Sequence, residues 1–342
     1  MKILYVLVSS EKDYYGEQAL ISMMSAKHHM PNCFISLLLD KTTDQNIANT
    51  KLPIDEYASE KIVIELDEAL SQTQKSRWLK TSMRELVKGD FLYVDVDTVF
   101  AAPIDESLFT HDVMGVPDGN TPLNDHPLKW QIEDNLKKLH FNNVFDYYIN
   151  GGVLFLKDTP AAHSFARKWH KRWQECCSQG IFIDQPALHQ AFIDSKQEQH
   201  LLPDFMNAQF GRNINTLADG TILHYYASWT KDSVYTPAFK FLQKEWLQNF
   251  RNNPNSEIFK TNIYNPKKAF DTNSIIMGQN FDKFFHSKLG HQFAAMHLST
   301  NNADIRLYHF LERQNECISK LYYKIINRFY PIKKIFLKIT GK

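Results

Sequence analysis

The sequence has few cysteines and no long apolar run. Its four cysteines are Cys33, Cys176, Cys177 and Cys317, and none of them form a C-x-x-C pair. This pattern argues against a disulfide framework or a zinc site and favours a reducing compartment. No stretch approaches the roughly 20 apolar residues of a transmembrane helix, and the apolar run at 3–8 is too short for a signal peptide. We therefore expect a cytoplasmic protein.

An excess of charge of either sign is also missing. The 342 residues include 39 Lys and Arg against 38 Asp and Glu, which gives a formal net charge of +1 at pH 7. Such a chain has no overall field to attract nucleic acid, so we expect no nucleic-acid partner. The composition, 43% hydrophobic and 23% charged, is that of a globular protein long enough for a large core.

Short apolar runs alternate with helical patterns in the first part of the chain. The apolar runs are residues 3–8, 33–39, 62–66 and 91–94. Helical patterns lie between them at about 16–29 and 75–87. Continuous apolar runs are typical of strands buried on both faces of a parallel sheet. The order predicts a doubly wound α/β sheet, mostly parallel and flanked by helices, with right-handed crossovers.

The rest of the chain predicts further strands and then a helical region. We expect strands at 113–116, 152–156 and 221–225, and helices at 160–178 and from 185 onward. Residues 117–148 are mixed and aromatic, as in an insertion or an acceptor loop. From about 237 we expect only helices and loops. The predicted division is a sheet domain at 1–235 and a helical C-terminal extension at 236–342.

The last 23 residues are basic and amphipathic. Residues 320–342 contain seven Lys or Arg and no Asp or Glu, and their apolar residues recur at helical spacing. Such a helix can lie on anionic lipid, where each surface lysine is worth up to about 1 kcal/mol. Alternatively, the helix docks on the body of the protein with its basic face in water. The first alternative predicts a peripheral protein on the inner face of the membrane.

Two aspartates end the fourth apolar run, F-L-Y-V-D-V-D. Asp95 and Asp97 stand two residues apart, directly after residues 91–94. A random chain of this length contains about one D-x-D pair. The pair alone therefore does not indicate a function, and the neighbouring sequence features must be considered with it. Mg²⁺ is commonly held by one or two carboxylates together with substrate phosphates. The pair therefore predicts a metal–diphosphate site at a strand end.

Other polar side chains end apolar runs at the same predicted edge. Ligands of open α/β sheets gather outside the carboxyl ends of the strands. The candidates are Ser9, Ser10, Asp13, Asn150, Asp184, Gln185 and His224. Manganese accepts an imidazole, so His224 suits a third ligand position, and Arg77 or Lys80 can neutralise a departing diphosphate. The alternatives are a strand-end histidine in a polar pocket for His224 and a helix N-cap for Asp184.

The order of these motifs resembles the retaining GT-A glycosyltransferases of family 8, including bacterial lipopolysaccharide galactosyl- and glucosyltransferases. The family pattern is an Arg on a helix, then L-Y-L-D-x-D, F-N-x-G-V, D-Q-x-x-L-N and a late H-F-x-G-x-x-K-P-W. The counterparts in this chain are Arg77, Y-V-D-V-D at 93–97, I-N-G-G-V at 149–153, D-Q-P-A-L-H at 184–189 and H-Y-Y-A at 224–227. The resemblance covers roughly residues 1–235.

The resemblance implies a GT-A (Rossmann-like) fold and a role for each matched residue. The metal ligands, for Mn²⁺ or Mg²⁺, would be Asp95, Asp97 and His224. The donor-binding residues would be Ser9, Tyr14, Arg77, Asp95, Asn150, Gly151 and Lys231. The catalytic residues would be Asp184, bonding sugar hydroxyls, and Gln185, under the anomeric carbon. The implied reaction moves a hexose from a UDP-sugar to a glycan or lipid-linked glycan, with retention.

The sequence departs from the family pattern at three places. Ala227 replaces a glycine, Lys231 stands one residue late for the phosphate-binding lysine, and His189 replaces an asparagine. In the segment after the first strand, either Tyr14 or Tyr15 could stack on the base.

Two other functions remain as alternatives. A nucleotidyltransferase making a nucleotide sugar would need a glycine-rich basic loop after the first strand, but residues 9–16 hold one glycine and one lysine. A non-catalytic sugar-nucleotide-binding relative is the other alternative, and the presence of Asp95, Asp97 and His224 argues against it.

Overall fold

The computed structural model describes residues 1–50, 52–126, 128–142, 144–226, 238–270 and 306. The chain divides into two compact units, Met1–Gln279 and Asn280–Lys342. The predicted basic helix at 320–342 and the predicted division at 235 lie outside the described residues, so both stay predictions. Among the described residues, no helix combines the length and apolar character needed to span a membrane.

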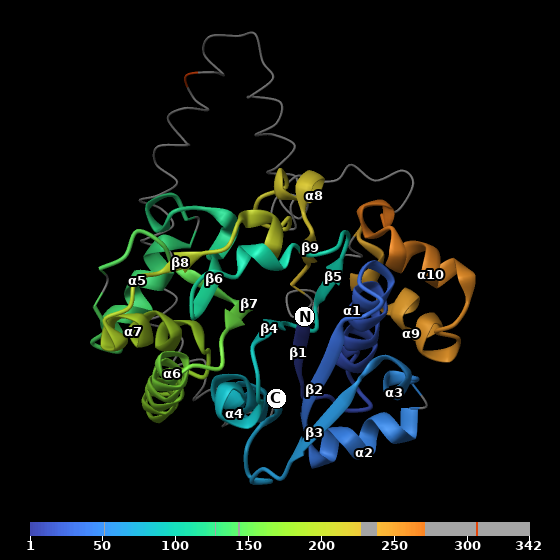
Figure 1. Ribbon diagram of the computed structural model, residues 1–342, viewed down its shortest axis with the longest axis horizontal. Coiled ribbons are helices and arrows are strands. Elements are labelled where there is room, and N and C mark those ends of the chain that lie inside the picture. The colour runs from blue at the N-terminus through green and yellow to red at the C-terminus, as the bar shows by residue number, and fades with distance from the viewer. Residues whose placement is uncertain (51, 127, 143, 227–237, 271–305, 307–342) are drawn as a thin grey trace. The chain divides into compact units, whose positions relative to one another are not determined.

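A seven-stranded sheet forms the centre of the first unit (Figure 1). In spatial order its strands are β3 (Glu60–Ile64), β2 (Phe34–Asp40), β1 (Lys2–Leu7), β4 (Phe91–Val94), β7 (Ile149–Leu156), β6 (Val113–Pro117) and β8 (His200–Leu201). The first four pair in parallel, as do β6 and β8. The predicted α/β class with a mostly parallel sheet is therefore confirmed.

Strand β7 runs antiparallel to both of its neighbours, β4 and β6. Its register pairs Val94 with Val153, and the Asp95 amide donates to the Gly152 carbonyl at 2.7 Å. Because β7 is reversed, its first residues lie where β4 ends. Asn150 and the two glycines after it therefore reach the edge of the sheet that carries Asp95.

Helices cover both faces of the sheet (Figure 1). The central strand β1 has buried apolar side chains on both faces, so each face needs a covering layer. Ile3, Tyr5 and Leu7 join one core with α1 (Tyr15–His29). Leu4 and Val6 join the other core with α4 (Gln72–Leu86), α6 (Pro160–Ser178) and α7 (Gln185–Ser195). The continuous apolar run thus corresponds to a strand buried on both faces, as the sequence predicts.

Local sequence explains where two of these helices begin. Ser71 and Gln74 form a capping box at the start of α4, with each side chain bonding the other's backbone amide. Thr159 caps α6 by accepting from the Ala162 amide at 3.2 Å, and Pro160 stands at the first helical position. Both caps fix helices that carry or support residues of the site.

Several elements were not anticipated from the sequence. These are β5 (Thr98–Phe100), β8, α2 (Lys41–Thr50), α3 (Ile54–Tyr57), α5 (Lys129–Lys138) and α8 (Thr216–Asp219). The third strand begins two residues earlier than predicted, and β9 spans only Ile222–His224. Helices α9 (Lys244–Asn252) and α10 (Glu257–Tyr264) pack against α1. The part of the predicted extension that the structure describes is therefore packed on the sheet unit.

A histidine near the start of α6 links three segments and makes stability depend on pH. His163 Nε2 lies 2.8 Å from Asp158 and its Nδ1 lies 2.7 Å from Glu85. These hydrogen bonds raise the pKa of His163 above its ordinary value of 6.5, and Asp158 has a lowered pKa. Arg84 and Arg167 also face the cluster. The stabilisation is complete below pH 6.5 and is lost as pH rises through the raised pKa.

We predict that His163→Gln destabilises the protein more at pH 6 than at pH 8.5. The difference should be a few tenths of a kcal/mol, since exposed pairs are screened by solvent. Urea unfolding at both pH values measures it. Arg167→Gln also removes a partner of Glu85 but no titrating group, so its cost should not change between the two pH values. An equal cost of His163→Gln at both pH values would contradict the prediction.

Candidate active site

A cleft of about 340 Å³ opens at the carboxyl ends of β1 and β4. One part of its wall comes from the end of β1 and the starts of α1 and α4, and includes Val8, Tyr15 and Gln72. Asp118, Arg212 and Tyr226 also line the cleft. The lining further includes these residues singled out in the sequence: Arg77, Lys80, Asp95, Asp97, Asn150, Gly151, Asp184, Gln185 and His224. The predicted edge of the sheet is therefore the wall of one cleft.

Asp95, Asp97 and His224 come together in this cleft. Each offers one ligand atom, and these atoms lie within 4.8 Å of one another. His224 reaches the pair through a separate two-stranded sheet, in which β9 pairs antiparallel with β5 and His224 stands opposite Thr98. His224 Nε2 lies 3.3 Å from Asp97 Oδ1. Two carboxylates and an imidazole are a donor set that suits Mn²⁺, so the cluster fits a divalent cation.

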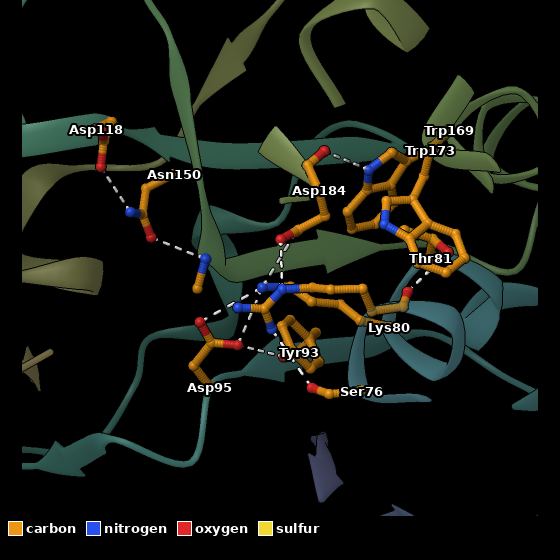
Figure 2. Close-up of polar contacts among 12 residues, drawn as sticks. Ser76, Lys80, Thr81, Tyr93, Asp95, Asp118, Asn150, Trp169, Trp173 and Asp184 are labelled. Carbon is orange, nitrogen blue, oxygen red and sulfur yellow. Dashed lines mark hydrogen bonds and ion pairs between the residues drawn. The ribbon is translucent and has the colours of Figure 1, made fainter. Parts of the chain in front are cut away.

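Two basic side chains of α4 join the carboxylates across the cleft (Figure 2). Lys80 Nζ lies 3.1 Å from Asp95 Oδ1 and 3.3 Å from Asp184 Oδ2, and Arg77 Nε lies 2.9 Å from Asp184 Oδ1. Burial opposes the charge of Arg77, but Asp184 and Asp95 raise its pKa above the ordinary value. The Tyr93 hydroxyl donates to Asp95 Oδ1, and burial raises the pKa of Tyr93 well above 10. These contacts hold the carboxylates of Asp95 and Asp184 in fixed positions.

Helix α6 holds the loop that carries Asp184. The indole N–H of Trp169 donates to the Asp184 carbonyl at 3.1 Å (Figure 2). The indole N–H of Trp173 donates to the Phe182 carbonyl, also at 3.1 Å. Asp184 precedes α7 at the N-cap position, but its side chain makes no capping bond. The carboxylate turns instead toward Arg77 and Lys80, so the N-cap interpretation does not hold for the side chain.

A chain of buried amides leads from Asp118 to His224. Asn150 Nδ2 donates to Asp118 Oδ1 at 2.7 Å, and Asn207 Nδ2 donates to Asn150 Oδ1 at 3.0 Å (Figure 2). Asn207 Oδ1 is thereby left to face His224 Nδ1 at 3.0 Å. Because Asp118 can only accept, these directions make His224 Nδ1 the protonated nitrogen. A neutral imidazole held in this way would direct its Nε2 lone pair toward Asp97 and the candidate metal position.

Asp118 is ionised at the far end of this chain. Burial alone would raise its pKa, but the bond with His126, the charge of Arg212 and the bond from Asn150 lower it to about 2. His126 Nε2 lies 3.2 Å from Asp118 Oδ2. Sequence reasoning missed both Asp118 and Asn207. Neither stands in a recognisable motif, since their position depends on contacts distant in sequence.

Two glycines at the start of β7 make room for these side chains. A Cβ atom on Gly152 would lie 2.4 Å from His224 Cε1 and 2.8 Å from Asn150 Oδ1. A Cβ atom on Gly151 would lie 2.9 Å from Asp184 Oδ2 and 3.2 Å from Lys80 Nζ. The sequence N-G-G thus allows His224 and Asp184 to approach the backbone of β7 on either side.

The structure separates the nucleoside candidates. Tyr15 lines the cleft, whereas Tyr14 and Ser9 are not among its lining residues. The Tyr14 ring lies 5.0 Å from the guanidinium carbon of Arg251, and Ser9 Oγ donates to Asp13 at 2.7 Å. Lys231 lies outside the described residues. The donor contacts predicted for Ser9, Tyr14 and Lys231 therefore stay predictions, and of the two adjacent tyrosines Tyr15 is the one that lines the cleft.

Comparisons with known proteins add a set of structural similarities. No family model and no curated protein matches the chain. Solved structures that resemble it include the galactosyltransferase LgtC, crystallised with donor and acceptor sugar analogues, at 13% identity and a TM-score of 0.45 over 76% of this chain and 99% of LgtC. The glycosyltransferase GlyE of Streptococcus pneumoniae TIGR4 and its apo form are similar at 14% and 15% identity and a TM-score of 0.46, over 80% of this chain and 66% of GlyE.

These similar structures are glycosyltransferases, the class that the sequence motifs resemble. The identities are low and the TM-scores lie below 0.5. The chemistry of the cleft itself must therefore decide the function.

We predict that Gly152→Ala destabilises the protein by a steric clash inside the site. The added methyl would meet the His224 ring and Asn150 in a fully packed strand, so unfolding free energy should fall by about 1–3 kcal/mol. Denaturant unfolding measures the loss. Gly16→Ala is the matched control, since Gly16 lies in α1 and its nearest neighbour is a flexible Leu52 methyl at 3.2 Å. The control should be neutral or stabilising. Equal stability of both variants would contradict the assigned packing.

Proposed function

We propose that this protein is a metal-dependent glycosyltransferase. It would transfer a hexose from a nucleoside diphosphate sugar, with UDP as the expected nucleotide, to a glycan or lipid-linked glycan. The observation that carries the proposal is the convergence of Asp95, Asp97 and His224 in one cleft with Asp184 and Gln185. That arrangement supports a cation position next to groups able to bind sugar hydroxyls.

The three proposed ligands would hold Mn²⁺ or Mg²⁺ through two carboxylate oxygens and one imidazole nitrogen. When bound, the cation would neutralise the charge that builds on the departing diphosphate. Lys80 and Arg77 supply further positive charge from α4. Their ion pairs with Asp184 and Asp95 hold them in place before substrate arrives, which reduces reorganisation during the reaction.

The sugar position would lie between Asp184 and the start of β7. The Asp184 carboxylate is only 4% exposed and is fixed by two cations, so it is preorganised to accept hydrogen bonds from sugar hydroxyls. Gly151 lines the cleft next to it and has no side chain to block a ring. Both polar atoms of the Asn150 side chain form hydrogen bonds in the amide chain, Nδ2 to Asp118 and Oδ1 from Asn207. We assign Asn150 the role of fixing the site beside the sugar.

Gln185 begins α7 and lines the same cleft. An inverting transferase needs a base that removes the proton from the acceptor hydroxyl. A glutamine amide has no such capacity at neutral pH. This residue next to Asp184 supports a retaining outcome, which an NMR assignment of the product anomer from an α-linked donor would test.

The direct test is metal-dependent use of a sugar nucleotide. The full-length protein is screened against UDP-, GDP-, ADP- and dTDP-sugars with MnCl₂ or EDTA, by thermal shift and by nucleoside diphosphate release. We expect a Mn²⁺-dependent shift with one nucleotide class, since a bound donor stabilises the fold by mass action. Asp97→Asn should lower turnover by about 10²–10³-fold. Asp219→Asn, at an exposed position in α8, should leave turnover unchanged.

Two results would contradict the proposal. One is a wild-type protein that neither binds nor cleaves any sugar nucleotide with metal present. The other is an Asp97→Asn variant that turns over at the wild-type rate. Formation of a sugar nucleotide from a nucleoside triphosphate and a sugar phosphate would instead indicate the nucleotidyltransferase alternative.

Asn207 should control metal affinity although it offers no ligand to the metal. Asn207→Leu removes the acceptor that orients the His224 imidazole, and loss of such an outer partner typically lowers metal affinity by about 10–100-fold. Asn207→Asp keeps an acceptor for His224 Nδ1–H, so it should lose less. Titration of Mn²⁺ followed by electron paramagnetic resonance measures affinity without turnover. Wild-type affinity in both variants would contradict the assigned role.

A further inference from the structure

Arg251, in the last turn of α9, reaches the loop between β1 and α1. Its guanidinium donates to the Asp13 carbonyl at 2.6 Å and to the Glu11 carbonyl at 3.2 Å. Its Nε donates to the Glu17 carboxylate in the first turn of α1. The guanidinium carbon also lies 5.0 Å from the Tyr14 ring centroid. One side chain thus binds the loop by two backbone carbonyls, one carboxylate and one aromatic face.

Glu17 fixes where the guanidinium lies. Its side chain is 1% exposed, and the Arg251 side chain is 25% exposed. A buried carboxylate without a partner is strongly unfavourable, so the ion pair ties α9 to the start of α1. The planar guanidinium then has two nitrogens left to bond the loop carbonyls in a fixed direction.

The loop itself is organised around the Asp13 carboxylate. It accepts bonds from Ser9 Oγ at 2.7 Å, from the Ser10 amide at 2.8 Å and from the Tyr15 amide at 3.1 Å. Gln72 Nε2 donates to it at 3.2 Å from the start of α4. Arg251 binds the carbonyl of this same aspartate, so both the side chain and the backbone of Asp13 are held.

The two ends of this loop reach the donor cleft. Val8 and Tyr15 line it, and Gln72 lines it beside them. Residues 9–14 do not line the cleft, and the carbonyls of Glu11 and Asp13 face Arg251. Movement of the loop would therefore displace Val8 and Tyr15, the part of the wall that follows β1, where the proposed donor would place its nucleoside.

We propose that Arg251 is a positioning residue for the nucleoside end of the donor cleft: it holds the loop at residues 9–14 so that Val8 and Tyr15 form the wall. This inference rests on the proposed function. It makes a helix beyond the sheet part of the donor site, although no residue of that helix lines the cleft.

Two matched variants separate positioning from stability. Arg251→Lys keeps a cation for Glu17 but has a single nitrogen, which cannot hold both carbonyls as well. Glu17→Gln removes the carboxylate charge but keeps an oxygen that accepts from Arg251 Nε, so the carbonyl bonds remain. The full-length proteins are titrated with UDP in MnCl₂ by calorimetry. Their melting temperatures and the hydrogen–deuterium exchange of residues 9–18 are measured without ligand.

We expect Arg251→Lys to weaken UDP binding by roughly tenfold, as for the loss of one charge-assisted hydrogen bond. Exchange in residues 9–18 should become faster, while Mn²⁺ binding without UDP stays unchanged. Glu17→Gln should lower the melting temperature with little effect on UDP binding. The inference is overturned if Arg251→Lys binds UDP like the wild type, or if UDP affinity follows melting temperature across both variants. A wild-type protein that binds no nucleoside diphosphate would instead overturn the proposed function.

Discussion

The antiparallel pairing of β7 beside β4 is the constraint on which the site depends. It brings the first residues of β7 to the end of β4, where the Asp95 amide bonds the Gly152 carbonyl at 2.7 Å. A parallel strand in that place would have put Asn150 at the opposite edge of the sheet. The pairing also requires glycine at 152, since His224 packs 2.4 Å from where a Cβ would lie. The position of His224 therefore depends on the glycine pair, and the position of the glycine pair depends on the register of β7.

Charge balance explains why this arrangement is stable without a substrate. Four carboxylates, those of Asp95, Asp97, Asp118 and Asp184, line the cleft. Burying them unpaired would cost several kcal/mol each. Lys80 and Arg77 lie against Asp95 and Asp184, while His126 pairs with Asp118. The α4 cations thus have two roles, since they stabilise the folded cleft and supply positive charge where a diphosphate would bind.

The sequence predicts the parts of the site that are local to strand ends and misses those that depend on distant contacts. Asp95, Asp97 and Asp184 follow apolar runs, so the sequence alone predicts their position at the edge of the sheet. The reversed direction of β7 carries no sequence signal beyond its glycines. Asn207 reaches His224 because the next residue, Ala208, pairs with β9. The Ala208 amide donates to the Ile222 carbonyl, and the Ala208 carbonyl accepts from the His224 amide. Tyr14 and Tyr15 are adjacent and differ only in helical phase, about 100° apart, so only the packing of Arg251 on Tyr14 separates them.

Two kinds of interaction hold the cleft wall: buried hydrogen bonds between side chains, and contacts of a partly exposed arginine with a surface loop. Beside the proposed metal position lies a buried chain of amides and carboxylates that ends at Asp118, and a fully bonded network of this kind is rigid. Beside the proposed nucleoside position lies a surface loop held by the partly exposed Arg251. In the proposed reaction, donor contacts beside the loop would be remote from the bond that breaks, yet their binding energy would help to orient the sugar against Asp184 and Gln185. Because the loop and the buried amide chain are held by separate contacts, changes at the loop would alter donor affinity while leaving the proposed reacting groups in place.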